Sequence, residues 1–504
     1  MQLSSRSKII ITIFIFIIGL LLRLFFLQHF SFTNDEGAYL YDAQTLLANS
    51  LPGGDVVTKT PVVILIFSFF VFLTDNSLYA TRIASLLFGL ATLLPLFVMT
   101  RYVIKGNWLI CMIAWLLFSA PVILMNFGHT ESIASFFAAT TIASLILAFR
   151  QKRYYLWALF GGISFVLAVG ARKINLVLIF PLIVLFLQNL GNKQTIKKVF
   201  AYFGLGAFIA LILLGGFVFR LYGSDGLMEF TGAGYTRIIA SNITGDSRVD
   251  IWGITFPETV KILGRTATAH LVVFWMIFFA FVLKISQRKI RDLKNPLLIF
   301  YVWLFALIVL YALWPTFLPD YAVDFLVPVT ILGLWIFDEI WARSLSYLRF
   351  FIVLCFILMN LLSFYSAIKS PWTGMFSVES SGTMTETIKK LVPKDEAILT
   401  GATIVPYVSG HRTQFNISHP LWYRYEFISN ERKTLFMPSW EKVASAIKNG
   451  EVKWILMEHL TDYAYFRNTD QLINLLDRDW ELVATVPNDT GFRSNTLKLY
   501  RRKE

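Results

Sequence analysis

The chain has 504 residues, of which 56% are hydrophobic and only 15% charged. The apolar residues fall in long continuous runs that no soluble core of this size needs, so the composition argues against a soluble protein and predicts a polytopic membrane protein. The net charge of +13 is what Lys and Arg in cytoplasmic loops produce, and we expect no nucleic-acid partner. Cys111 and Cys355 both fall inside apolar runs, which argues against a disulfide framework.

The first apolar run follows Arg6 and Lys8 and extends over about twenty residues. It is too long for the apolar region of a signal peptide, and no small-residue cleavage site follows it. We therefore expect an uncleaved first membrane helix at about 9–28.

Apolar runs close to the roughly 20-residue length of a membrane span recur along the chain. The run 61–73 is shorter and is broken by Thr74-Asp75-Asn76, so we expect an interfacial or re-entrant helix there and not a span. The predicted spans, about eleven transmembrane helices in all, are 9–28, 78–103, 108–125, 131–149, 154–171, 174–190, 199–222, 266–284, 296–314, 321–341 and 350–368.

Basic residues set the expected orientation. With the N-terminus in the cytoplasm, the cytoplasmic loops hold most of the Lys and Arg, for example around 101–105, 150–153, 193–198 and 284–294, whereas the alternate loops hold far fewer. The positive-inside rule then predicts a multi-pass protein of the plasma membrane with a cytoplasmic N-terminus. With a cytoplasmic N-terminus, the first loop at 29–77 lies on the outer face. An odd number of spans would place the C-terminal residues there too.

The first outer loop contains the strongest candidate for chemistry. Thr33-Asn34-Asp35 is typical of a helix start, and the spacing of apolar residues over 36–49 predicts a short amphipathic helix on the membrane surface. From the pattern alone, a helix cap is the simpler interpretation of Asp35. Two adjacent carboxylates, Asp35 and Glu36, are more than one cap requires, however, and a carboxylate at a low-dielectric boundary suits removal of a hydroxyl proton. We expect Glu36 to orient or pair, not to act as the base.

Basic residues of the outer face are candidates for binding an anion. Lys59 precedes Pro61, which is typical of the first turn of a helix, and a cation at a helix N-terminus is tolerable where an anion binds. A lipid phosphate is the obvious anion, although a lysine anchored at the membrane surface explains Lys59 too. Arg172 and Lys173 lie between two spans on the outer side, against the positive-inside trend.

Further polar residues lie at the ends of predicted spans. Glu131 is the first residue of a predicted span, at its outer end. A carboxylate stabilised by the helix N-terminus explains this residue as well as a functional role does. His129 and Glu131 are too few for a metal site, because zinc or manganese takes a third or fourth ligand. Arg23, Arg82 and His270 either line a cavity or pair with carboxylates.

Residues 369–504 are mostly polar and form a separate predicted domain. Residues 397–399, 454–457, 481–484 and 497–500 are predicted strands, and 379–391, 440–449 and 468–477 are predicted helices. This pattern predicts a C-terminal extracytoplasmic α/β domain after a transmembrane domain at 1–368. It contains no glycine-rich phosphate loop, Cys/His metal spacing or nucleophile elbow.

Carboxylates and cations on one face of a membrane are what transfer from a polyprenyl-phosphate donor to a hydroxyl acceptor requires. Four stretches also match known motifs by their order and spacing. These are Asp35-Glu36-Gly37-Ala38-Tyr39 followed by Lys59-Thr60-Pro61, then Asn126 to Glu131, then Gly161-Gly162 to Arg172-Lys173 with Pro181, and finally Pro319 to Pro328 with Tyr321 between them.

Together these stretches, within about residues 10–340, resemble the GT-C membrane glycosyltransferases of the protein O-mannosyltransferase and aminoarabinose transferase type. That family has an Asp-Glu pair in its first outer loop, a downstream Lys-Pro-Pro motif, a second acidic residue at the fourth helix, a glycine-rich span ending in a basic residue, and a late Tyr-x6-Pro helix. The resemblance implies a GT-C fold, a polyprenyl-phosphate-linked sugar donor and transfer with inversion.

The resemblance also implies roles for individual residues. It makes Asp35 the general base, and we predict Asp35, Glu36 and Glu131 as catalytic residues. Thr58 stands where aminoarabinose-type enzymes place a metal-binding Glu. The resemblance therefore establishes no cofactor, and both metal-dependent and metal-independent transfer are compatible with it. The predicted substrate-binding residues are Lys59, Arg172, Lys173, Tyr321, His129 and Arg82.

Other function classes fit the sequence less well. A transporter or a flippase for lipid-linked sugars would use buried Arg, His and Glu along a path, but such proteins usually show repeated halves, and none is evident here. A binding or assembly protein would leave the acidic first loop and Arg172-Lys173 unexplained. The partners we expect are the lipid-linked donor, membrane lipids and a glycan, lipid or protein acceptor.

Overall fold

The computed structural model of the protein resolves into two compact units. The helical unit comprises residues 1–28, 85–216 and 255–370, and the mixed unit comprises 29–84, 217–254 and 371–504. The residues that the structure describes are 5–29, 32–48, 61–105, 108–118, 128–230, 295–312, 321–343, 346–369, 376–418, 440–466, 470–488 and 496–503.

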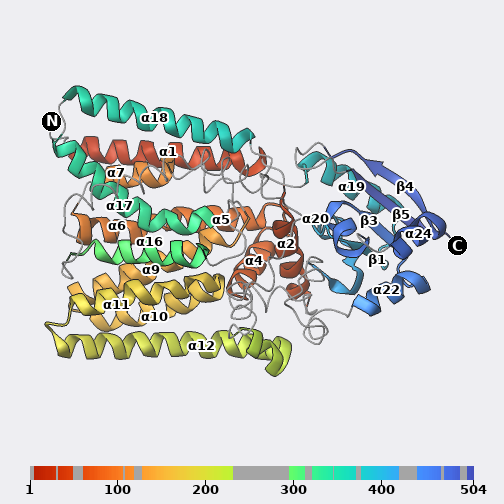
Figure 1. Ribbon diagram of the computed structural model, residues 1–504, viewed down its shortest axis with the longest axis horizontal. Helices are drawn as coiled ribbons and strands as arrows, with labels where there is room; N and C mark the ends of the chain where they lie inside the picture. The colour runs from red at the N-terminus through yellow and green to blue at the C-terminus, as the bar shows by residue number, and fades with distance from the viewer. Residues whose placement is uncertain are drawn as a thin grey trace. The chain divides into compact units, whose positions relative to one another are not determined.

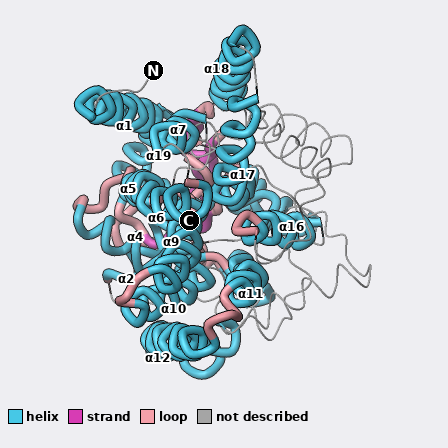
Figure 2. The backbone as a smooth tube through the Cα atoms, turned by 90° about the vertical axis from the view of Figure 1, so that its left-hand side faces the viewer, coloured by secondary structure: helices cyan, strands magenta, loops and turns pink. Residues whose placement is uncertain are grey.

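The helical unit is built from long apolar helices, and most of them coincide with predicted spans (Figure 1). Figure 2 views them nearly end-on, with α9, α10 and α11 next to one another. Their bounds are α1 Ser5–His29, α6 Leu93–Met99, α7 Trp108–Ile113, α9 Glu131–Arg150, α10 Tyr154–Ala171, α11 Ile179–Gln188, α12 Lys193–Phe230, α16 Leu298–Ala312, α17 Ala322–Arg343 and α18 Ser346–Lys369. Helix α12 is kinked at Gly223 and continues beyond residue 216, where the helical unit ends.

Four helical segments in the described part of the chain are long and apolar enough to cross a membrane: Ala80–Ile104, Glu131–Arg150, Tyr154–Ala171 and Lys193–Leu221. Several other predicted spans appear as shorter apolar helices, and the predicted span 266–284 lies outside the described residues. The architecture is thus mostly helical with a small C-terminal sheet, as predicted.

Proline explains an interruption in the hydrogen bonding of one predicted span. The predicted run 78–103 is divided into α5 (Ala80–Ala91), α6 and a π-helical turn, η1, at Thr100–Ile104. Pro95 has no N–H to donate to the carbonyl of Ala91. The helical hydrogen bonding of α5 therefore ends at Ala91, and α6 begins at Leu93. The unit boundary at 84/85 falls within α5, so this helix contributes residues to both units.

Glycine brings α10 and α12 into close contact. A Cβ atom on Gly162 would lie 2.0 Å from the carbonyl oxygen of Phe203, and one on Gly206 would lie 2.1 Å from that of Leu159. Small residues at such a crossing let two helix backbones approach closely, which is a common basis of helix packing in membranes.

The mixed unit contains a five-stranded sheet with the order β2-β1-β3-β5-β4. β1, β2 and β3 are parallel, whereas β5 runs antiparallel to β3 and to β4. The four predicted strands and three predicted helices of the C-terminal region are confirmed, and β2 and α20 are additions. The bounds are α19 Val378–Leu391, β1 Ala397–Thr400, α20 Ile404–Ser409, β2 Arg412–Thr413, α22 Trp440–Asn449, β3 Trp454–Met457, α24 Asp470–Asp479, β4 Trp480–Val486 and β5 Leu497–Arg502.

The mixed unit also contains the two helices of the first outer loop, α2 (Asn34–Leu47) and α4 (Pro61–Leu73). The sequence predicts that α2 is an amphipathic surface helix, and the structure corrects this: every residue over 36–43 is buried. The reason is that α2 packs against α4 and also against α20 of the C-terminal region, so it has neighbours on faces that a surface helix would leave open.

Candidate active site

The first turn of α2 carries the two adjacent carboxylates. Thr33 is the N-cap, and its Oγ1 accepts a hydrogen bond from the backbone N–H of Glu36 at 3.1 Å. The capping role considered for Asp35 therefore belongs to Thr33. Asp35 lies within the first turn, partly buried, where the helix dipole favours a carboxylate.

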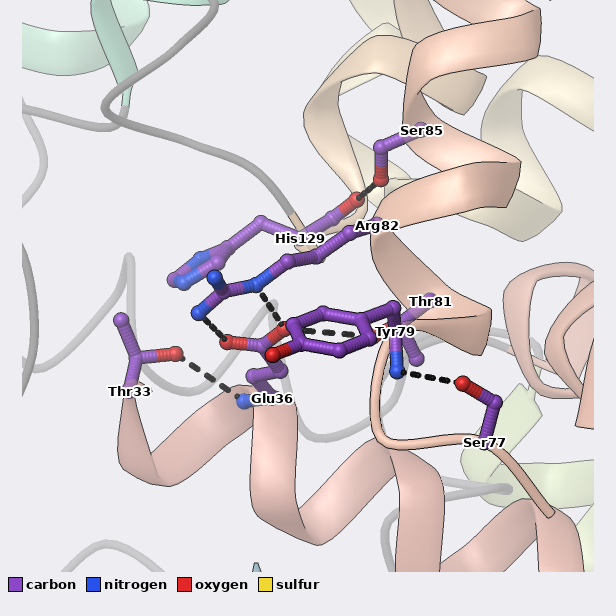
Figure 3. A network of polar contacts seen from close by, with 8 residues as sticks. All are labelled: Thr33, Glu36, Ser77, Tyr79, Thr81, Arg82, Ser85 and His129. Atoms are coloured by element: carbon purple, nitrogen blue, oxygen red, sulfur yellow. Dashed lines mark hydrogen bonds and ion pairs between the residues drawn. The ribbon is translucent and has the colours of Figure 1, made fainter. Parts of the chain in front are cut away.

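Glu36 is held by Arg82 in a buried, two-point ion pair (Figure 3). Arg82 Nε donates to Glu36 Oε1 at 2.6 Å, and Nη2 donates to Oε2 at 2.9 Å. The exposed fractions of the two side chains are 1% and 0%. Arg82 also lies over the ring of Phe32, 4.4 Å from its centroid, and the hydroxyl of Thr81 lies 3.4 Å from Glu36 Oε1.

This pair fixes α2 to α5 across 46 residues of sequence. Breaking a buried ion pair by removing one partner costs about 3–5 kcal/mol, because the remaining charge stays buried. The arrangement gives Glu36 and Arg82 a positioning role: they hold the helix turn that carries Asp35.

A second cluster lies in the helical unit around Arg172, which is the residue just after α10. Its Nη1 contacts Glu131 Oε1 at 2.5 Å and Asp324 Oδ2 at 3.3 Å. The hydroxyl of Tyr311 donates to the same oxygen of Asp324. Arg172 also lies over the ring of Tyr321, 5.0 Å from its centroid.

His129 forms the border of this cluster. Its backbone carbonyl accepts a hydrogen bond from the hydroxyl of Ser85 on α5 at 3.2 Å, as Figure 3 shows. Its Nδ1 lies 4.0 Å from Glu131 Oε2, the second oxygen of the carboxylate that holds Arg172. The preceding Gly128 has a φ of 79°, a backbone conformation that favours glycine. His129 itself lies just before α9, which begins at Glu131.

The electrostatics of this cluster differ from those of a simple phosphate site. One guanidinium nitrogen is shared between two buried carboxylates, so Arg172 is already neutralised within the protein. The structure thus brings four predicted site residues together: Glu131, His129, Arg172 and Tyr321.

Two residues of the cluster, Asp324 and Tyr311, are absent from the sequence-based set. Asp324 carries the signal that could have identified it, because it is a carboxylate within the predicted apolar span 321–341. Tyr311 has no such signal. Its phenol sits in an aromatic-rich run, and it stacks on Tyr321 with a centroid distance of 5.2 Å.

Other predicted polar residues are placed as follows. Arg23 is buried in α1 and donates to the carbonyl oxygens of Leu116 at 2.8 Å and Gly19 at 3.0 Å. It therefore satisfies backbone groups instead of lining a path. Lys173 is the first residue of the 3-10 turn η3 (Lys173–Leu178). Lys59, Asn126, Phe127, His270 and Pro319 lie outside the described residues.

A metal site is not evident among the side chains that the structure describes. No group of three or more His, Cys, Asp or Glu residues in that part of the chain is arranged to hold an ion. Glu131 and Asp324 instead contact the guanidinium of Arg172.

Comparison with solved structures defines the fold. The chain superimposes on ArnT from Cupriavidus metallidurans bound to undecaprenyl phosphate with a TM-score of 0.62 and 13% identity, covering 98% of both chains. The chain has the GT-C fold. No protein-family profile and no curated protein matches the sequence.

The same GT-C fold relates the chain to larger transferases. For AglB, the oligosaccharyltransferase of Archaeoglobus fulgidus in complex with an inhibitory peptide and dolichol-phosphate, the TM-score is 0.58 at 12% identity, covering 90% of this chain and 70% of AglB. For the arabinofuranosyltransferase AftD from Mycobacteria, the TM-score is 0.52 at 13% identity, covering all of this chain and 40% of AftD.

Proposed function

We propose that this protein is an integral membrane glycosyltransferase that moves a sugar from a polyprenyl-phosphate donor to a hydroxyl acceptor on the outer face of the membrane. The observation that supports this most strongly is the likeness over 98% of both chains to ArnT bound to undecaprenyl phosphate. AglB, which shares the fold, is in complex with dolichol-phosphate. Lipid phosphates thus occur in two solved proteins of this fold.

Asp35 is the proposed general base. It is partly buried next to Glu36, whose carboxylate is already engaged by Arg82. Glu36 therefore has a positioning role, and the resemblance of the Asp35-Glu36 pair to the acidic pair of GT-C transferases supports Asp35 as the base. The N-cap of α2 is Thr33 and not Asp35.

The proposed reaction is a single displacement with inversion. Asp35 removes the hydroxyl proton of the acceptor as the acceptor oxygen forms a bond to C1 of the sugar. The bond between C1 and the phosphate oxygen breaks on the opposite face, and polyprenyl phosphate leaves with the electron pair. Lys59, which lies in the same outer loop as Asp35, is proposed to bind the phosphate as its charge develops, because it supplies a cation.

The test is transfer by the Asp35→Asn variant. Membranes containing the full chain are supplied with polyprenyl-phosphate sugars extracted from the same cells, and transfer to the acceptor fraction is measured. We expect a loss of at least about a hundredfold, which is the typical contribution of a general base. Asp75→Asn is the matched control, because Asp75 is an exposed carboxylate on the same outer loop. Transfer by Asp35→Asn at the level of that control would overturn the assignment.

A further inference from the structure

The sheet of the C-terminal region has the strand order of a ligand-binding α/β fold. The chain passes from β1 to β2 on one side and then to β3 on the other side of β1, all parallel. In open α/β sheets, ligands bind outside the carboxyl ends of the strands at such a switch point. Here the carboxyl ends are at Thr400 and Met457.

At this switch point, polar groups of the C-terminal region form hydrogen bonds with one another. The N–H of Gly401, just after β1, donates to Thr461 Oγ1 at 2.7 Å. Thr461 in turn donates from its backbone N–H to the buried carboxylate of Glu458 at 2.7 Å. In such folds a backbone amide after the strand can bind the ligand. Here that amide, the N–H of Gly401, already donates to Thr461 within the protein.

Helix α2 occupies the adjacent space at the carboxyl ends of β1 and β2. Gly37 lies against the start of α20, where an added Cβ would lie only 2.8 Å from the backbone nitrogen of Ile404. One turn later, the hydroxyl of Tyr41 accepts a hydrogen bond from the N–H of Thr413 at 2.9 Å. Burial raises the pKa of Tyr41, so its hydroxyl stays protonated across neutral pH.

Two further contacts flank α2 in sequence and join the same two regions. Phe32 forms a two-way backbone bridge with Phe376, with N···O distances of 2.7 and 3.0 Å. The hydroxyl of Tyr407 in α20 donates to the carbonyl oxygen of Ser77 at 3.3 Å. The residues just before α2 and those after α4 are thus both fastened to the C-terminal region.

We propose that the C-terminal α/β module, α19 to β5, is a scaffold that positions the first turn of α2, with α2 occupying the edge where related sheets bind a ligand. The inference rests on the proposed function for its catalytic consequence, because Asp35 is then the residue being positioned. Gly37 and Tyr41 are positioning residues: they contact the module two and six positions after Asp35.

The first test compares two glycine substitutions in the full-length chain. Gly37→Ala places a methyl group against the backbone of Ile404, so α2 and α20 must shift relative to each other. The matched control is Gly382→Ala in α19, where an added Cβ meets nothing within 4 Å. We expect Gly37→Ala to lower kcat at least about tenfold, with an unchanged donor KM and a shifted acidic limb in the pH profile of kcat, because the base is misplaced. Gly382→Ala should match the wild type.

A loss of folded protein would lower kcat without moving the pH profile, so the profile separates positioning from general damage. The second test uses hydrogen exchange, which reports the docking of α2 whether or not sugar is transferred. Tyr41→Phe should speed amide exchange over 34–47 by about tenfold or more, because Thr413 loses its acceptor. Tyr500→Phe, a change of the same kind on β5, should not.

Unchanged exchange over 34–47 in both Gly37→Ala and Tyr41→Phe would overturn the docking. Faster exchange with unaltered kcat and pH profile would overturn the positioning role. These failures differ from failure of the proposed function, which would appear as undiminished transfer by Asp35→Asn while α2 remained protected from exchange.

Discussion

At the scale of single residues, the cluster around Arg172 shows how charge is balanced inside the helical unit. Arg172 is one cation between two carboxylates, Glu131 and Asp324. Removing the cation leaves two buried carboxylates facing each other, whereas neutralising Asp324 leaves a balanced pair of Arg172 and Glu131. The two changes should therefore have unequal effects.

We expect Arg172→Met to destabilise the chain by about 3–5 kcal/mol, the usual cost of leaving a buried charge without its partner. Asp324→Asn should cost about 1 kcal/mol, because the amide oxygen still accepts from Tyr311 and Glu131 still binds Arg172. Thermal unfolding of the two purified variants under matched detergent conditions checks the order. A larger loss for Asp324→Asn than for Arg172→Met would contradict this account of the cluster.

At the scale of elements, the packing of α10 on α12 depends on glycine at the crossing. An added Cβ on Gly206 would overlap the carbonyl oxygen of Leu159, but one on Gly204 meets nothing within 4 Å. The two glycines lie two residues apart in one helix, so any gain in helix propensity from alanine is shared by both sites.

Gly206→Ala should therefore lower stability by about 1–3 kcal/mol through overpacking, while Gly204→Ala should be neutral or slightly stabilising. Thermal unfolding in detergent compares the pair directly. Equal unfolding temperatures for the two variants would show that the helices do not depend on this close approach.

The elements themselves could be predicted because the signals for them are local. Long apolar runs gave the helices of the helical unit, and short ones gave strands such as 454–457. The partners of the site residues could not be predicted, since they come from distant parts of the chain. Glu36 pairs with Arg82, Arg172 with Asp324, and α2 packs on the start of α20. The surface position predicted for α2 was wrong for the same reason: a single helix pattern does not reveal a second neighbour.

At the scale of the whole molecule, the fold is shared with ArnT over nearly the full length at only 13% identity. Such a likeness shows that the arrangement of apolar helices is retained while most individual side chains differ. The fold alone does not define an activity. The proposal of sugar transfer is therefore supported by the lipid-phosphate complexes of proteins with this fold, together with Asp35. A transporter or flippase of lipid-linked sugars is the alternative to exclude.

The most direct test of the central claim is mass spectrometry of lipids and cell-surface glycans from cells that contain the wild-type chain, Asp35→Asn or Asp75→Asn. We predict that one sugar modification is present with the wild type and with Asp75→Asn. With Asp35→Asn it should be absent, and the corresponding polyprenyl-phosphate sugar should accumulate, because the donor is no longer consumed. The same modification at the same level in Asp35→Asn cells would contradict a glycosyltransferase that uses Asp35 as its base.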